Sequence, residues 1–157
     1  GIRVAEMAYA IGMRIVVYTR STPEQKQIAL KKVKGQFVSL EELLKTSDFV
    51  TLHTPLVDRA IIGWQELQLM KPSAYLINTS RGGNIHEDSL ITWLKKKRIA
   101  GAALDVYAKE PLQETSEWYE LDNIIVTPHV ASVSPEAAVR ASMMVAEKVD
   151  KILKNSY

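Results

Sequence analysis

The sequence predicts an α/β fold in which an open parallel sheet carries helices on both faces. Short apolar runs rich in β-branched residues alternate along the chain with segments of helical periodicity. The apolar runs end in turn-forming or polar residues, as expected of parallel strands that right-handed helical crossovers connect. We find no internal repeat, low-complexity tract or linker, so residues 1–157 are expected to form one domain.

Composition narrows the class of protein. Hydrophobic residues make up 46% of the 157 residues and charged residues 24%, as in ordinary globular domains. A net charge of +2 gives no electrostatic case for nucleic acid, and no apolar run approaches the ~20 residues of a membrane span. The absence of cysteine excludes disulfides, thiolate catalysis and Cys-ligated metals. We therefore expect a cytoplasmic protein without a metal site.

The first third of the chain predicts two helices around a strand. Residues 1–11 have apolar side chains at helical spacing, and Gly12 is placed to end that helix. Residues 14–18 (RIVVY) are predicted to form a buried parallel strand. Thr22 is then expected to cap a basic helix over residues 24–34, whose lysines predict a solvated face.

Capping residues define three later helices. Ser39 is predicted to cap the helix after it, because Glu42 stands at the capping-box spacing. His86 is predicted to be a solvated capping residue rather than a catalytic one, and a long helix is expected from Ser134 to about Lys154. The remaining predicted elements are strands at 36–39, 48–53, 74–77, 99–106 and 123–126 and helices at 40–45, 64–70, 85–97 and 117–120.

Arg81 follows the predicted strand 74–77 in a polar, glycine-rich turn. In an open α/β sheet the ligand crevice lies beyond the carboxyl ends of the strands, so Arg81 is placed to meet a ligand. Its planar guanidinium suits a carboxylate, and Gly82 and Gly83 permit close approach of the backbone. The alternative is a surface arginine in an ordinary loop.

Polar residues follow three strands in succession: Arg81, then Asp105 with Glu110, then His129. Histidine titrates near neutral pH, and a carboxylate on one ring nitrogen fixes its tautomer and favours its protonated form. This set suits acid–base chemistry on an anionic substrate. Each residue also has an ordinary interpretation, as a loop histidine, a surface charge or a strand-end cap.

Residues 78–83, 101–112 and 127–132 resemble the three signatures of the D-isomer-specific 2-hydroxyacid dehydrogenases, and 52–56 and 70–72 resemble two weaker stretches of that family. The resemblance covers essentially the whole chain in the right order. It implies a Rossmann-type nicotinamide-binding domain and a small 2-hydroxy or 2-oxo acid as substrate. The hydride would be carried by the cofactor.

The resemblance also implies roles for individual residues. Arg81 would bind the carboxylate and carbonyl of the substrate, and His129 would exchange a proton with the substrate oxygen. Glu110 would pair with His129, and Asp105 would face the nicotinamide carboxamide. For His53 the alternative to a cofactor contact is a strand-end histidine whose hydrogen bonds are satisfied within the protein. The other implied cofactor contacts are Gly1, His53, Thr54, Pro55 and Thr79.

The chain departs from the family pattern at both ends. Gly1 matches the third glycine of the G-x-G-x-x-G turn, and the sequence stops within or soon after its last long helix. We therefore expect residues 1–157 to be a partial dinucleotide-binding domain that is inactive, or nearly so, on its own. The alternative is a non-catalytic, truncated α/β domain that is either a folded fragment or a self-associating module, expected to form homo-oligomers. The apolar residues expected to drive association are Val139, Met143, Met144, Val149 and Ile152.

Cofactor choice is expected to depend on Thr19, Arg20 and Ser21, which follow strand 14–18. NAD-preferring Rossmann domains usually carry an acidic residue there for the ribose 2′-hydroxyl, and this chain has none. The pattern resembles NADP-preferring domains, in which Arg20 and a hydroxyl would meet the 2′-phosphate. The alternative is drift in a protein that binds no dinucleotide. The complete protein is thus expected to use NADP or NAD, and this chain to bind either one or none.

The resemblance implies the strand order 3-2-1-4-5-6-7, of which strand 1 is absent here. We expect the sheet to close over the gap by pairing strand 14–18 with strand 48–53, which gives the flavodoxin-like order 2-1-3-4-5. An open gap would leave two apolar strand edges unpaired in the core. A second copy of the chain, or a separate polypeptide that supplies the strand, is the alternative.

Overall fold

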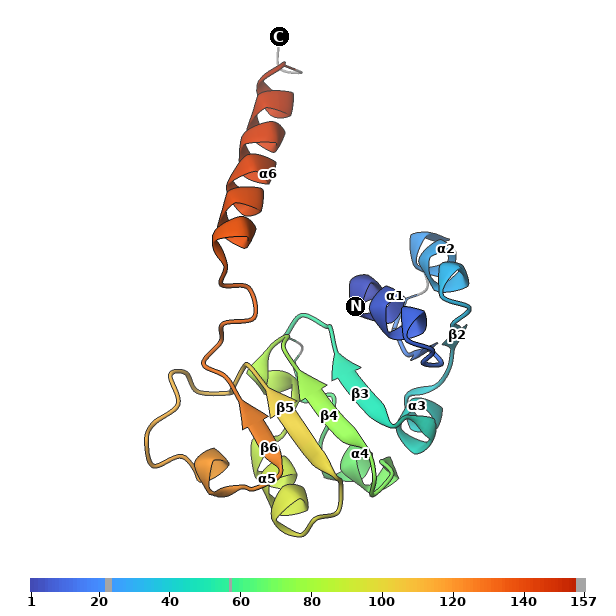
Figure 1. The fold of residues 1–157 in the computed structure, drawn as a ribbon, viewed down its shortest axis with the longest axis vertical. Helices are drawn as coiled ribbons and strands as arrows, with labels where there is room; N and C mark the ends of the chain where they lie inside the picture. Colours follow the sequence, from blue (N-terminus) through green and yellow to red (C-terminus); the bar gives the residue numbers. More distant parts are fainter. Residues whose placement is uncertain (22–23, 57, 155–157) are drawn as a thin grey trace.

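The computed structural model describes residues 1–21, 24–56 and 58–154, which form two parallel sheets (Figure 1). The smaller sheet pairs β1 (Val16–Val17) with β2 (Gln36–Phe37). The larger sheet has the order β3-β4-β5-β6. Its strands are β3 (Phe49–Leu52), β4 (Tyr75–Asn78), β5 (Gly101–Leu104) and β6 (Ile124–Val126).

All neighbouring strands of the larger sheet run parallel. One row of partners crosses it from Val50 through Leu76 and Ala102 to Ile124. Because the strands are parallel and in step, their carboxyl ends meet at one edge of the sheet. The loops after β3, β4, β5 and β6 are therefore neighbours, as the sequence predicts.

The predicted helices are present in the predicted order. Gly12 follows the first of them with a φ of +89°, a conformation suited to glycine. The short helix expected near residue 117 is a 3₁₀ helix, and the 3₁₀ turn after Arg81 was not predicted. The helices are α1 (Ile2–Ala10), α2 (Glu24–Lys32), α3 (Leu40–Thr46), α4 (Trp64–Leu69), η1 (Gly82–Asn84), α5 (Glu87–Lys95), η2 (Glu117–Glu120) and α6 (Pro135–Lys154).

Two of the predicted caps are confirmed. The hydroxyl of Ser39 accepts a hydrogen bond from the backbone N–H of Glu42 at 3.1 Å. The Nδ1 atom of His86 accepts one from the backbone N–H of Ser89 at 3.3 Å, so His86 caps α5. The cap expected at Thr22 lies outside the described residues.

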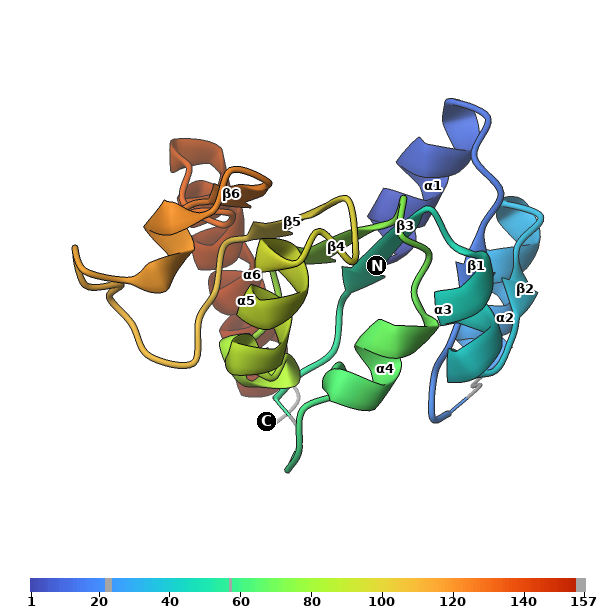
Figure 2. The same ribbon diagram turned by 90° about the horizontal axis from the view of Figure 1, so that it is seen from below.

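The core lies on one face of the larger sheet. Leu44, Leu67 and Leu94, from α3, α4 and α5, are buried in one cluster with Val50 and Leu76. Figure 2 shows α4 and α5 on the same side of this sheet. On the opposite face the rings of Phe49 and Tyr75 stack at 5.5 Å and stay about half exposed, and Ile125 is also exposed. The predicted α/β fold, an open parallel sheet flanked by helices, is thus confirmed, and among the described residues α3, α4 and α5 supply the helical side of this core.

The predicted closure of the sheet, by pairing of strand 14–18 with strand 48–53, is wrong. Among the described residues β1 pairs only with β2, and β3 pairs only with β4. The expectation assumed that both free edges would be buried. Instead Val16 and Val17 are half-buried rather than core residues, and Phe49 is half exposed. Water can reach such edges, so no further ladder is needed to satisfy their polar groups.

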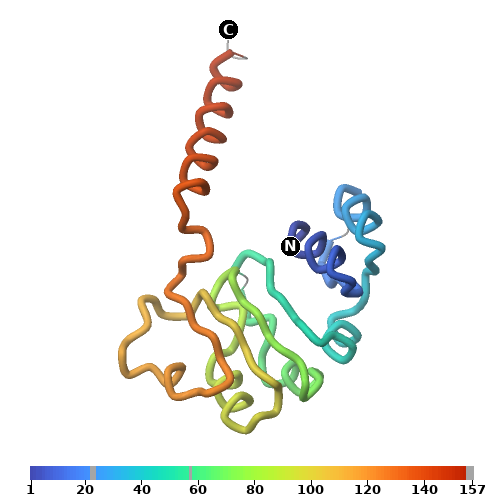
Figure 3. The backbone as a smooth tube through the Cα atoms, viewed as in Figure 1, coloured from blue at the N-terminus to red at the C-terminus, as the bar shows by residue number. Residues whose placement is uncertain are grey.

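The last helix, α6, extends away from both sheets (Figures 1 and 3). None of its residues is buried, although it carries several large apolar side chains. No helix in the described part of the chain is long and apolar enough to cross a membrane.

Candidate active site

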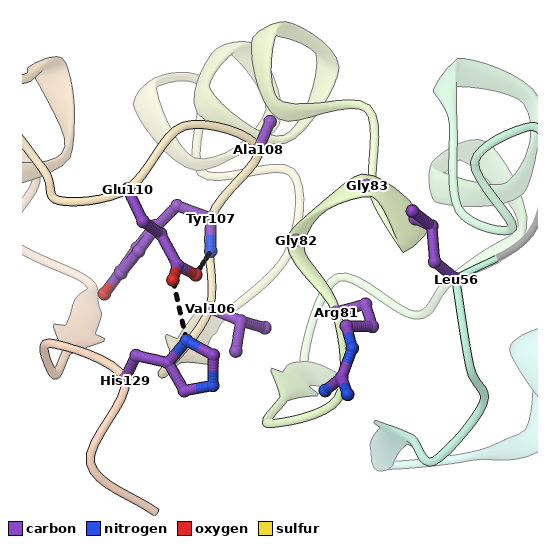
Figure 4. A pocket seen from close by; sticks show the side chains of 9 residues that line it. All are labelled: Leu56, Arg81, Gly82, Gly83, Val106, Tyr107, Ala108, Glu110 and His129. Carbon is purple, nitrogen blue, oxygen red and sulfur yellow. Dashed lines mark hydrogen bonds and ion pairs between the residues drawn. The ribbon is translucent and has the colours of Figure 1, made fainter.

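A pocket of about 360 Å³ lies beyond the carboxyl ends of β4, β5 and β6 (Figure 4). It brings together the three predicted catalytic residues, which come from three different loops. The loop after β3 contributes one apolar side chain. The lining residues are Leu56, Arg81, Gly82, Gly83, Val106, Tyr107, Ala108, Glu110 and His129.

Glu110 and His129 form a hydrogen-bonded pair on the pocket wall. The Nδ1 atom of His129 lies 2.6 Å from Oε2 of Glu110. The other carboxylate oxygen of Glu110 accepts the backbone N–H of Tyr107 at 2.9 Å. The hydrogen bond from His129, and then that from Tyr107, lower the pKa of the Glu110 carboxyl. Because Nδ1 is occupied by Glu110, Nε2 is the ring nitrogen left to meet a substrate.

Arg81 lies across the pocket from His129, with Val106 between them (Figure 4). Its turn is shaped by the buried side chain of Asn78. The amide nitrogen of Asn78 donates to the carbonyl of Arg81 at 2.9 Å, and its oxygen accepts the backbone N–H and the hydroxyl of Ser80. The Arg81 guanidinium donates to the Ser80 carbonyl at 2.6 Å. A pocket with a cation on one side and an imidazole on the other suits a small anionic ligand.

Gly82 lets the Arg81 turn pack directly on the loop after β5. A Cβ atom at Gly82 would lie 1.9 Å from the carbonyl carbon of Tyr107. The sequence predicts that this glycine permits a close approach, and the structure shows that the approaching group is backbone of the same chain. The contact joins the loop that carries Arg81 to the loop that carries Glu110.

Asp105 anchors the loop after β6. Its side chain is buried and accepts hydrogen bonds from the Thr127 hydroxyl and from the backbone N–H groups of Val130 and Ala131. Burial alone would raise the pKa of this carboxyl, but these hydrogen bonds outweigh it and the pKa is lowered. The same loop holds His129 at a φ of +57°, which is uncommon for a residue other than glycine. Asp105 therefore stabilises the backbone that presents His129, and it is not among the pocket residues.

Tyr107 is a site residue that the sequence did not single out. Its hydroxyl lies 2.9 Å from the carbonyl oxygens of both Leu104 and Thr127, at the ends of β5 and β6. Burial is the largest cause that raises its pKa, to about 12. A tyrosine two residues after a strand-end aspartate gives no local signal for this cross-link, because Thr127 is twenty residues away in sequence.

The turn after β1 gathers two hydroxyls and two cations. The hydroxyl of Thr19 donates to the carbonyl of Ser21 at 2.9 Å. From α2, the ammonium group of Lys26 donates to the Thr19 hydroxyl at 3.0 Å and to the Ser21 hydroxyl at 3.3 Å. Arg20 lies between them and is exposed. Lys26 is exposed, as predicted for a solvated face, and its ammonium group also reaches the predicted cofactor turn.

His53 and Gly1 meet beyond the end of β3. A Cβ atom at Gly1 would lie 3.4 Å from the Cβ of His53. Burial lowers the pKa of His53. The ring of His53 also lies 3.2 Å from the Thr51 hydroxyl, so its interpretation as a satisfied strand-end histidine stays open.

The remaining predicted cofactor residues follow β3 and β4. Thr54 accepts hydrogen bonds from the Asn84 amide through its carbonyl and its hydroxyl, both at 3.1 Å. Pro55 and Thr79 are exposed. None of these three lines the pocket of Arg81, Glu110 and His129.

Taken together, the cofactor candidates fit a dinucleotide. Seven of them follow β1, β3 or β4 at the carboxyl ends of the strands, where doubly wound sheets bind such cofactors, whereas Gly1 precedes α1 and Asp105 follows β5. Among these seven, Thr19, Ser21, Thr54 and Thr79 carry hydroxyls and Arg20 carries a cation, groups that suit phosphates, whereas the Asp105 carboxylate is engaged by the loop after β6. Among the described residues no group of three or more His, Asp or Glu side chains could hold a metal ion.

Comparison with known proteins agrees with this geometry. Residues 1–131 match the family described as "D-isomer specific 2-hydroxyacid dehydrogenase, NAD binding domain". The glyoxylate reductase of Aeropyrum pernix is 41% identical over 151 residues, which are 95% of this chain and 44% of that protein. The chain thus spans about half the length of curated relatives that it matches.

Two solved structures have the same fold. A D-lactate dehydrogenase from Sporolactobacillus sp. superimposes with a TM-score of 0.85 at 33% identity, over 99% of this chain and 50% of that one. An acyclic imino acid reductase in complex with NADPH and D-Arg gives a TM-score of 0.82 at 32% identity, over 97% of this chain and 47% of that one. With the strand order and the Arg81–Glu110–His129 pocket, these matches show that the chain belongs to the D-isomer-specific 2-hydroxyacid dehydrogenase family, as its NAD-binding domain.

Proposed function

We propose that this domain serves an oxidoreductase that moves hydride between a nicotinamide cofactor and a small 2-oxo or 2-hydroxy acid, such as glyoxylate or pyruvate. The observation that carries the proposal is the Glu110–His129 pair, which faces Arg81 across one pocket. The pocket, at about 360 Å³, is near the small end of the usual range for ligand sites. That size suits a substrate of a few heavy atoms.

In this proposal Arg81 binds the substrate carboxylate and orients the neighbouring carbonyl. When bound, a reduced nicotinamide cofactor would supply the hydride for the carbonyl carbon. The Nε2 atom of His129 donates a proton to the carbonyl oxygen, which becomes the hydroxyl of the product. Glu110 accepts the Nδ1–H of His129, so it fixes the ring and stabilises the imidazolium before transfer. The reverse sequence oxidises the 2-hydroxy acid.

Gly1, His53, Thr54, Pro55, Thr79 and Asp105 stay proposed cofactor residues. For Asp105 we propose an indirect role, because its described hydrogen bonds go to the loop that presents His129. We further propose that the turn of Thr19, Arg20 and Ser21, together with Lys26, favours NADPH. Two hydroxyls and two cations offer donors to a 2′-phosphate, and no carboxylate stands among them to repel it.

A chimera tests the proposal. Residues 1–131 would replace the matched segment of the Aeropyrum pernix glyoxylate reductase, and reduction of glyoxylate would be followed through oxidation of NADPH and NADH. We expect turnover in the chimera and a loss of roughly a hundred- to ten-thousand-fold in kcat for His129→Gln. The matched control is His86→Gln, since His86 is an exposed helix cap outside the pocket. A folded chimera in which His129→Gln keeps full activity would contradict the assignment.

The second candidate function is that of a non-catalytic, self-associating domain. The observation that favours it is α6, which carries large apolar side chains and has no buried residue. The 157-residue polypeptide by itself is expected to show little or no turnover under either function, because hydride transfer needs a closed, dry cleft. Calorimetry with NADPH and NADH, combined with light scattering, separates the two. If the chain forms a dimer or a larger species and binds neither NADPH nor NADH, the second function is favoured. The apolar α6 residues in question are Val139, Met143, Met144, Val149 and Ile152.

A further inference from the structure

Glu87 joins two loops of the site, although it lies outside the pocket lining. It is the first residue of α5 and follows the loop that carries Arg81. Its Oε1 atom accepts the backbone N–H of Ala108 at 2.7 Å, across 21 residues of sequence. Ala108 belongs to the loop after β5, two residues before Glu110.

The loop after β5 is held from several sides at this point. Gly82 packs against the Tyr107 carbonyl, and the Tyr107 hydroxyl is bound to carbonyls at the ends of β5 and β6. Ala108 has no polar side chain of its own, and the hydrogen bond that joins it to α5 is donated by its backbone N–H. The bond from Ala108 to Glu87 therefore fixes the segment between Tyr107 and Glu110.

We propose that Glu87 is a positioning residue, which holds Glu110 in place for His129 by accepting the backbone N–H of Ala108. This inference rests on the proposed function, since Glu110 matters to the reaction only through His129. Glu87 is half-buried, and burial is the largest cause that raises its pKa; the hydrogen bond from Ala108 opposes that rise, and the charges of Asp88 and Glu110 add to it. A half-buried carboxylate near two other carboxylates is unfavourable unless it makes a specific contact, and Ala108 provides that contact.

The pKa of the Glu110 carboxyl distinguishes positioning from a simple charge effect. That pKa is lowered by hydrogen bonds from His129 and Tyr107. If Glu87 acted only as a nearby negative charge, its removal would lower the pKa of Glu110 further. If Glu87 positions the loop, its removal weakens both hydrogen bonds and raises the pKa of Glu110 toward its ordinary value. The two roles predict shifts of opposite sign.

The experiment is a ¹³C NMR titration of the Glu110 side chain in the full 157-residue chain. In Glu87→Ala we expect the pKa of Glu110 to rise by roughly one unit and the Ala108 amide to exchange with solvent about tenfold faster. Glu87→Gln keeps an acceptor oxygen without the charge, so it should leave the pKa of Glu110 low. Asp88→Ala is the matched control, because it removes a carboxylate from the same helical turn without touching the loop.

The outcomes separate this inference from the proposed function. A low Glu110 pKa that persists or falls in Glu87→Ala overturns the role of Glu87 and leaves the proposed function intact. An equal rise in Asp88→Ala also overturns it, because a general effect of helix charge would then suffice. An ordinary pKa for Glu110 in the unmodified chain contradicts the Glu110–His129 pair itself, and with it both proposals.

Discussion

The Nδ1 atom of His129 and the Oε2 atom of Glu110 lie 2.6 Å apart, although the two residues are 19 positions apart and follow different strands. Glu110 is oriented by the Tyr107 amide, and the loop of His129 is held by Asp105. Tyr107 and Asp105, which are both buried, thus hold Glu110 and His129 in place. Because these contacts come from the protein itself, the pair is preorganised.

The first prediction concerns the pH dependence of activity in the chimera. Reduction needs a protonated His129, and the Glu110 carboxylate stabilises that form. In Glu110→Gln the neutral amide no longer does so, and the alkaline limb of the reduction profile should move to lower pH. Rates of glyoxylate reduction between pH 5 and 9 measure this, with Glu114→Gln as a control outside the pocket. Superimposable profiles for Glu110→Gln and the unmodified protein would argue against the pair.

The second prediction concerns stability. A carboxyl whose pKa is lowered in the folded state stabilises the fold at pH values above its ordinary pKa, which is 4.5 for Glu110. That contribution is lost as the pH falls through the lowered pKa. The free energy of unfolding of Glu110→Gln should therefore be lower than that of the unmodified chain, and this difference should be largest at neutral pH. Urea unfolding at several pH values measures this difference. A difference that grows as the pH falls would contradict the prediction.

Gly82→Ala is predicted to destabilise the chain by about 3 kcal/mol. The new Cβ would overlap the Tyr107 carbonyl, which is backbone and cannot move aside without displacing the loop of Glu110. Gly83→Ala is the matched control, because its Cβ would meet only the flexible end of Leu56. Thermal unfolding followed by circular dichroism tests this. Equal effects of the two substitutions would show that the close approach at Gly82 is unimportant.

Coenzyme preference is predicted to depend on the turn after β1. Thr19→Asp should reverse a preference for NADPH, because a carboxylate repels the 2′-phosphate and can accept the 2′-hydroxyl of NADH. Lys26→Ala should weaken NADPH binding and leave NADH binding nearly unchanged, whereas Lys45→Ala, in the surface pair with Glu41, should affect neither. Calorimetric titration of the chimera gives both affinities. Tighter binding of NADH than NADPH by the unmodified turn would refute this assignment.

The sequence predicted the strand ends and the site that they create. The meeting of Arg81, Glu110 and His129 in one pocket could be predicted because each follows an apolar run, and parallel strands bring such loops to one edge. The caps at Ser39 and His86 could be read locally, since capping depends on residues three positions apart. These features follow from short-range pattern and topology.

Other features depend on contacts that no local pattern encodes. The hydrogen bond between Glu87 and Ala108 spans 21 residues of sequence, and that between Lys26 and Thr19 joins α2 to the turn after β1. The predicted closure of the sheet failed because it assumed a buried edge, whereas β1 is short and half-buried. Hydrophobic residues in a strand predict that strand but not how deeply it is covered, which depends on what packs beside it.

Transfer of deuterium tests the proposed reaction most directly. The chimera would be given pyruvate and reduced cofactor that carries deuterium at the transferable position of the nicotinamide, and the lactate would be analysed by mass spectrometry and chiral chromatography. We predict D-lactate with one deuterium at C2, and its loss in Arg81→Gln and His129→Gln. Unlabelled or L-lactate, or undiminished labelled product from His129→Gln, would contradict the proposal that Arg81 and His129 carry this reaction.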